Sequence, residues 1–152
     1  TRSDLVLEFR RVLFRSATTG DFMGTGQWVE LNISNNTIAS YGTYTFSNQA
    51  DVLIHARLAA DAVGATKMDR PEWVTVHPTS GEVYVTLTNN SGRTSTNDAN
   101  PRTSNVYGQI VRWRETGGDA AATTFDWDIF VLAGNPTVTA NQGTAREHQL
   151  GQ

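Results

Sequence analysis

The strongest constraint on the fold is a series of four segments in which apolar and polar residues alternate. They cover residues 73–77, 82–87, 109–114 and 124–133. Alternation with a period of two predicts strands with one buried face. The "HPTSGE" stretch between the first two supplies the proline and glycine of a turn. Four successive antiparallel strands within about 60 residues predict one blade of a β-propeller, which usually takes about 40–45 residues.

One helix is predicted ahead of these strands, between Asn48 and Gly64. Asn48 is a suitable N-cap, and Gly64 is a suitable C-terminal stop. Four residues at helical spacing form one apolar stripe: Val52, Ala56, Ala59 and Val63. The predicted fold class is therefore all-β, a fragment of a β-propeller. It consists of about one four-stranded blade at residues 72–133 with one preceding α-helix.

Residues 1–16 differ in character from the rest of the chain. They hold four of the twelve Lys and Arg residues and end in "VLFRS", which is typical of a translated sequencing adapter. We expect this segment to be non-native and residues 17–152 to be a partial propeller domain. A lone blade cannot cover both its faces or close a ring, so we expect a fragment on that ground also.

Composition excludes several classes of function. The net charge of -3 and pI near 5.5 argue against a nucleic-acid binder held by a basic surface. The sequence has no apolar run of about 18 residues, so no membrane span is predicted. It also has no cysteine. Any metal site within it would use oxygen or imidazole ligands, and oxygen ligands favour calcium, magnesium or manganese.

Three neighbouring charged residues, Asp69, Arg70 and Glu72, stand directly ahead of the first strand, in "DRPEW". Pro71 favours an extended conformation for Arg70, so we expect Arg70 and Glu72 to point the same way. A guanidinium binds phosphate oxygens through paired hydrogen bonds, and a carboxylate can hold a metal ion that polarises a phosphoryl group. The alternative is an ordinary surface ion pair, which contributes about 0–1 kcal/mol.

The segments "GATKMDRPEWVTVHPTSGEVYVTLTNN" and "NPRTSNVYGQIVRWRETGGDAAATTFDWDIFVLAG" resemble the PhoX family of bacterial alkaline phosphatases. The resemblance is dense over residues 47–136. It implies a β-propeller that hydrolyses phosphate monoesters with calcium and iron at its centre, exported to the periplasm or beyond. It matches Glu72 to a metal ligand and Arg70 to a phosphate-binding arginine. These two are the predicted catalytic residues.

Further residues have weaker candidate roles. Asn89 and Asn90 follow a strand and can offer amide oxygens to calcium, although such residues also form ordinary turns. Gln109 stands where family members often carry histidine, which puts any role for this position in doubt. Asp126 and Asp128 share a strand face, which we expect to be solvated. The family's iron cluster also uses a cysteine, so we expect the missing ligands to lie outside this chain.

Three functions for the parent protein stay open at this point. The first is a phosphomonoesterase acting on small phosphate monoesters. The second is a calcium-dependent lactonase on a similar propeller, and the third is a non-catalytic propeller used for binding or scaffolding. We expect the isolated chain to be inactive, because a metal cluster cannot assemble on it alone.

Overall fold

The structure, a computed structural model, describes residues 10–16, 22–135 and 144–145. They fall into two compact units. Of the described residues, one unit contains 10–13 and Gln27–Ala65, and the other contains 14–16, 22–26, 66–135 and 144–145. Within the described ranges, no helix has the length and apolar character needed to cross a membrane.

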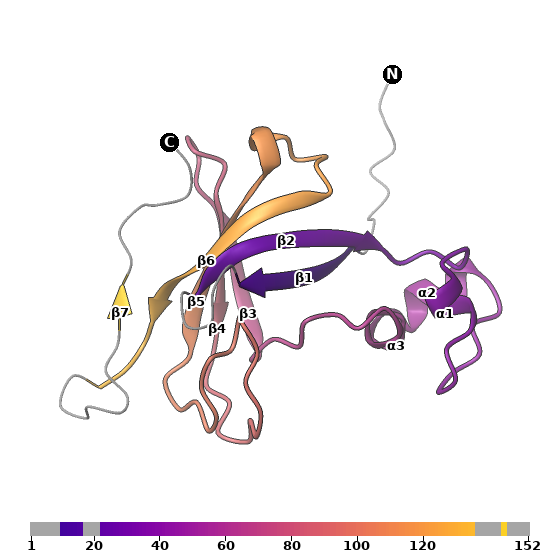
Figure 1. Cartoon of the computed structure of the whole chain (residues 1–152), viewed down its shortest axis with the longest axis horizontal. Helices are drawn as coiled ribbons and strands as arrows, with labels where there is room; N and C mark the ends of the chain where they lie inside the picture. The colour runs from indigo at the N-terminus through magenta and orange to yellow at the C-terminus, as the bar shows by residue number, and fades with distance from the viewer. Residues whose placement is uncertain (1–9, 17–21, 136–143, 146–152) are drawn as a thin grey trace. The chain divides into compact units, whose positions relative to one another are not determined.

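The four predicted strands are confirmed and pair with their sequence neighbours in antiparallel fashion (Figure 1). Each starts or ends within about two residues of its predicted position, which is the usual uncertainty of a strand boundary. They are β3 (Pro71–Val76), β4 (Val83–Leu87), β5 (Gln109–Glu115) and β6 (Thr124–Leu132). The all-β fold class and the blade of four strands therefore hold.

Three further strands extend the sheet beyond the predicted blade. β2 (Met23–Glu30) lies beside β6, and β1 (Arg10–Ser16) lies beside β2. The short β7 (Thr144–Ala145) pairs with the last two residues of β6. Since β5 already occupies one edge of β6, both β2 and β7 use the other edge.

Cross-strand packing of one sheet face explains why these segments are strands. Val85, Val111 and Ile129 are direct partners on β4, β5 and β6, and all three are buried. Each buried side chain of this size contributes about 1.5–3 kcal/mol relative to exposure. Phe125 and Trp127 continue the same apolar face and are almost fully buried.

A bulge in the β5–β6 pair changes the predicted alternation near the end of β6. The register shifts between Ile110 and Val111, so that Phe130 is an extra residue and Val131 pairs with Ile110. Val131 thereby leaves the apolar face on which the sequence pattern placed it. Bulges are usual where a strand bends and twists.

β3 is not the buried strand that its sequence suggests. Trp73 is 78% exposed and Val74 is 60% exposed, and every residue of β3 lies in the exposed class. The reason is position, because β3 is the last strand of the sheet and has only β4 beside it. Alternation of apolar residues is therefore a correct guide to its conformation and a wrong guide to its burial.

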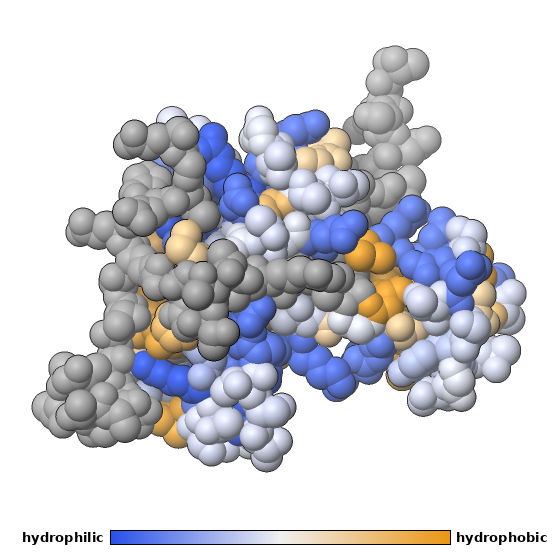
Figure 2. Space-filling model, viewed as in Figure 1, coloured by the Kyte–Doolittle hydropathy of each residue, from blue (hydrophilic) through white to orange (hydrophobic). Residues whose placement is uncertain are grey.

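The antiparallel order places the long β4–β5 loop, residues 88–108, and the chain leading into β3 at one end of the sheet (Figure 1). The β3–β4 and β5–β6 turns lie at the opposite end. Figure 2 shows blue and pale residues at the tip of the long loop, in keeping with its many exposed Asn, Ser, Thr and Gly residues.

The unit around Gln27–Ala65 contains α1 (Asn36–Ala39), α2 (Gln49–Ile54) and α3 (Ala56–Ala62). The predicted cap is confirmed, since Asn48 Oδ1 accepts the N–H of Asp51 at 3.0 Å. The predicted helical region is confirmed, but it is divided at His55 into α2 and α3, and the His55 ring packs on Tyr44 with 4.7 Å between ring centroids. The buried core of this unit is Leu31, Ile38, Phe46, Val52 and Ala59.

Asp51 ties the start of α2 to the segment before it. Its Oδ2 accepts the backbone N–H of Ser47 at 2.9 Å, and its Oδ1 accepts the hydroxyl of Tyr44 at 2.8 Å. The bond from the Ser47 backbone, followed by that from Tyr44, lowers the pKa of Asp51 below its ordinary value. The hydrogen bond to Asp51 raises the pKa of the Tyr44 hydroxyl.

These contacts predict an acid-sensitive contribution to stability. A lowered folded-state pKa means that the stabilisation is complete above the unfolded pKa of about 4 and is lost as pH falls through the folded pKa. Asp51→Asn retains an acceptor for Tyr44 but cannot accept from Ser47 with its amide nitrogen. We expect the difference in melting temperature between the chain and Asp51→Asn to shrink below about pH 4. A difference that is constant with pH would contradict the assignment.

Candidate functional site

Arg70 has a left-handed backbone, with φ of +35°, and not the extended one predicted from Pro71. This conformation costs a residue with a side chain about 1–2 kcal/mol. Contacts on both sides of Arg70 explain it. Asp69 is completely buried, and the Arg70 carbonyl accepts the backbone N–H of Thr88 at 3.2 Å. These long-range contacts override the local preference of a residue before proline.

Glu72 is the extra residue of a β-bulge at the start of β3. Pro71 pairs with Leu87 and Trp73 pairs with Thr86, which leaves Glu72 without a cross-strand partner. The regular alternation that was expected to point Arg70 and Glu72 the same way is therefore absent. Glu72 is exposed, and among the described residues its carboxylate has no hydrogen-bond or ion-pair partner. It is available to an external ligand.

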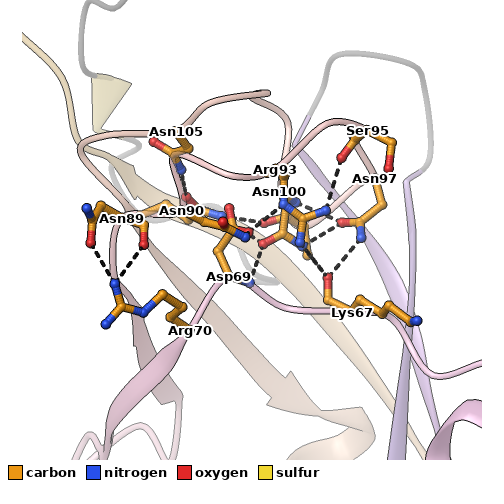
Figure 3. Close-up of polar contacts among 12 residues, drawn as sticks. Lys67, Asp69, Arg70, Asn89, Asn90, Arg93, Ser95, Asn97, Asn100 and Asn105 are labelled. Carbon is orange, nitrogen blue, oxygen red and sulfur yellow. Dashed lines mark hydrogen bonds and ion pairs between the residues drawn. The ribbon is translucent and has the colours of Figure 1, made fainter.

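The Arg70 guanidinium is held by the residue at the start of the long loop. Its Nη1 donates to Asn89 Oδ1 at 3.1 Å and to the Asn89 carbonyl at 3.4 Å (Figure 3). Arg70 is exposed, and its Nε and Nη2 donate to no described residue. These two nitrogens form the edge of the guanidinium with which arginine can bind an oxyanion through two parallel hydrogen bonds.

Asp69, directly before Arg70, is the centre of a buried polar network. Its Oδ1 accepts from Asn90 Nδ2 at 2.8 Å and from Arg93 Nε at 2.5 Å (Figure 3). Its backbone N–H donates to Asn100 Oδ1 at 2.8 Å. The Asp69 Oδ2 atom is buried and has no hydrogen-bond partner in the described part of the chain. Removing one partner of a buried ion pair typically costs about 3–5 kcal/mol.

The Lys67 carbonyl is a second point at which the long loop is attached. It accepts from Arg93 Nη2 at 3.2 Å, Asn97 Nδ2 at 2.9 Å and Asn100 Nδ2 at 2.7 Å. Side chains of the loop therefore supply the hydrogen bonds to the Lys67 carbonyl that regular secondary structure would otherwise supply. These contacts hold the long loop in a defined conformation.

Gln109 has a structural role in the same network. Its Oε1 accepts from Asn105 Nδ2 at 2.6 Å, and its Nε2 donates to the Ala99 carbonyl at 2.9 Å and to Asn100 Oδ1 at 3.2 Å. All of these bonds are buried. The side chain therefore connects the base of the long loop to β5, and its bonding capacity is largely used within the protein.

Asp128 is not on a solvated face, contrary to the prediction. It is 2% exposed and accepts two hydrogen bonds from Arg112, its cross-strand partner on β5, at 3.0 and 2.5 Å. Burial lowers the pKa of Arg112, but the hydrogen bonds of Asp128 and Tyr84, together with the charges of Asp128 and Glu82, outweigh burial and leave that pKa raised. Glu82 lies 3.8 Å from the same guanidinium. Asp126 is exposed, as predicted.

The sequence analysis proposed roles for Arg70, Glu72, Asn89 and Asn90 but did not single out the residues that hold them in place. Asp69 was noted only as one of three neighbouring charges, and Arg93 and Asn100 were not singled out. The available signal was the density of asparagine in "NNSGRTSTNDANPRTSN". In a loop that must satisfy buried backbone groups, such residues act as hydrogen-bond partners.

The described residues contain no group of three or more His, Cys, Asp or Glu side chains arranged to hold a metal ion. The one unpartnered carboxylate beside Arg70 is that of Glu72. Its oxygens are the kind of ligand that calcium prefers, so the site fits one ligand of a metal centre but not a complete one.

Comparison with known proteins identifies the family. The family model for alkaline phosphatase PhoX matches residues 6–151. The chain belongs to the PhoX family of alkaline phosphatases. The resemblance that "MDRPEW" and "TLTNN" carry is thereby confirmed.

Among solved structures, this PhoX-family chain is similar to Pseudomonas fluorescens PhoX in complex with vanadate, a transition state analogue. The two are 55% identical, with a TM-score of 0.72 over 80% of this chain and 22% of that chain. The chain thus spans about a fifth of the length of that protein. No curated protein matches it.

The surroundings of Gly81, in the β3–β4 turn, and Gly108, at the end of the long loop, predict that substitution by alanine will destabilise the protein to different extents. Both Gly81 and Gly108 have positive φ, but a Cβ on Gly108 would lie 2.3 Å from the Leu87 carbonyl oxygen, whereas one on Gly81 meets nothing. We expect Gly81→Ala to cost about 1–2 kcal/mol from conformation alone. Gly108→Ala should cost a further 1–3 kcal/mol or so from the clash. Chemical denaturation measures both, and equal losses would contradict the close approach.

Proposed function

We propose that this chain is part of a metal-dependent phosphomonoesterase in which Arg70 binds the phosphate and Glu72 binds a metal ion. The observation that carries the proposal is that two side chains only two residues apart in the chain both have unused groups: the exposed guanidinium of Arg70, whose Nε and Nη2 have no described partner, and the unpartnered carboxylate of Glu72. It occurs in a chain 55% identical to a PhoX that binds vanadate. The substrates would be small phosphate monoesters.

The chemistry follows from the two side chains. The Nε and Nη2 groups of Arg70 would donate to two phosphate oxygens and stabilise the charge that spreads over the phosphoryl oxygens during transfer. Glu72 would supply an oxygen ligand to calcium, which when bound polarises the phosphoryl group. We propose calcium together with iron, in keeping with the family resemblance. The chain has no cysteine, so the other ligands of an iron centre would come from elsewhere in the parent protein.

Of the two candidate asparagines, Asn90 is the better calcium ligand. The Asn89 amide oxygen already accepts from the cationic Arg70, and a second cation on the same oxygen would be repelled. Asn90 uses its amide nitrogen to bond Asp69, and no described residue donates to its amide oxygen. We therefore propose Asn90 as an auxiliary ligand and Asn89 as a partner of Arg70.

The vanadate-bound relative favours this function over the alternatives. A pentavalent oxyanion that mimics phosphoryl transfer has no obvious use on a lactonase or on a binding scaffold. Family membership also leads us to propose that the parent protein is exported to the periplasm or beyond. An assay of the complete gene product on both an aryl phosphate and a lactone separates the two enzyme classes.

Two substitutions test the proposal in the complete gene product. Arg70→Ala should lower kcat/KM for an aryl phosphate about 10²–10³-fold, because a transition-state donor is lost. Glu72→Gln should lower both activity and bound metal, the latter measured by elemental mass spectrometry after gel filtration.

Matched controls are an exposed arginine and an exposed carboxylate elsewhere on the chain. Arg57→Ala on α3 and Asp126→Asn on β6 should leave kcat/KM within about twofold of the wild type, as distant surface changes do. If Arg70→Ala retains full activity, or Glu72→Gln retains both metal and activity, the assignment is wrong.

A further inference from the structure

The conformation of Arg70 demands an explanation that the proposed function does not supply. A residue with a side chain is rarely found at positive φ, and such residues persist only where their surroundings hold them. Arg70 stands at φ +35° between a fully buried aspartate and the first residue of β3. Something must therefore prevent the backbone from relaxing to an extended form.

Asp69 fixes the Arg70 backbone on its N-terminal side. Its side chain is bonded to Asn90 and Arg93, and its backbone N–H is bonded to Asn100, all within the long loop. On the other side, Thr88 donates its backbone N–H to the Arg70 carbonyl at 3.2 Å. Rotation of Arg70 to an extended conformation would withdraw the Asp69 carboxylate from Arg93 and leave two buried charges unpaired.

Asn89 fixes the position of the Arg70 guanidinium. Both of its oxygens accept from the same nitrogen, Nη1, which restricts the orientation of the guanidinium and leaves Nε and Nη2 without a partner among the described residues. An arginine in solution loses side-chain freedom when it binds an oxyanion. Here the side chain of Arg70 loses this freedom when the protein folds, so the guanidinium already has the orientation needed to bind an oxyanion.

We propose that Asp69 and Asn89 are positioning residues for Arg70, the first acting through its backbone and the second through its guanidinium. This inference rests on the proposed function, because it assumes that Arg70 binds the phosphate. Neither residue is required to touch substrate. A double-mutant cycle with Arg70 isolates such indirect action, since residues that work through one group have non-additive effects.

The experiment measures kcat/KM for an aryl phosphate and the inhibition constant of orthovanadate in the complete gene product. Asp69→Asn keeps the size of the side chain but removes its charge. Alone, it should lower kcat/KM about 10–100-fold and weaken vanadate by a similar factor, because a small displacement of a catalytic group has that effect. In the Arg70→Ala background, it should change either quantity by less than about threefold.

A matched control shows what a purely structural loss would do. Asp128→Asn removes the charge of another buried aspartate paired with a buried arginine, on the strands of the same sheet. Any loss that it causes should be the same factor with and without Arg70. If Asp69→Asn behaves in that way, with equal factors in both backgrounds, Asp69 only maintains the fold and the inference is overturned.

Asn89→Ala keeps the test decisive if Asp69→Asn does not fold. Asn89 is exposed, so its removal should leave the melting temperature within a few degrees of the wild type. It should weaken vanadate binding about 3–10-fold in the wild type and have no effect in Arg70→Ala. Equal effects in both backgrounds refute the positioning role. Full activity of Arg70→Ala itself would instead refute the proposed function.

Discussion

The buried ion pair between Asp69 and Arg93 is the contact on which the candidate site depends. It joins the segment entering β3 to the first part of the long β4–β5 loop, two parts of the chain separated by the whole of β3 and β4. From the same loop, Asn90 donates to the Asp69 carboxylate and Asn100 accepts the Asp69 backbone N–H. Because an unpaired buried charge would be costly, this ion pair holds the long loop and the segment before β3 in one fixed arrangement.

That arrangement determines the position of each residue with a proposed chemical role. Arg70 follows Asp69 directly, and Glu72 follows across a proline and a bulge. Asn89 and Asn90 stand at the start of the loop that Asp69 anchors. A loop is usually the most variable part of a fold, yet this one can carry binding groups because a rigid sheet and a buried polar network fix both of its ends.

Four strands of the sheet, β3 to β6, could be predicted from sequence, whereas β1, β2 and β7 were missed. The site could be predicted only in part. Alternation identifies β3 to β6 because side chains of a strand take opposite faces whatever lies around them. It failed for the burial of β3 and Asp128, since burial depends on neighbours that the pattern does not contain. Asp128 reads as a solvent-facing acid until Arg112 is placed opposite it. The left-handed Arg70 was unpredictable for the same reason, because contacts some 20 to 30 residues away outweigh the local effect of Pro71.

The exposed outer edge of β3 has a consequence for handling this chain. Within the described residues no strand pairs with that edge, and Trp73, Val74 and Val76 stand on it uncovered. Unpaired backbone groups flanked by apolar side chains are a template for strand addition by another copy. The isolated chain should therefore self-associate as its concentration rises, and a lysine introduced in the middle of β3 would be the simplest way to keep it monomeric.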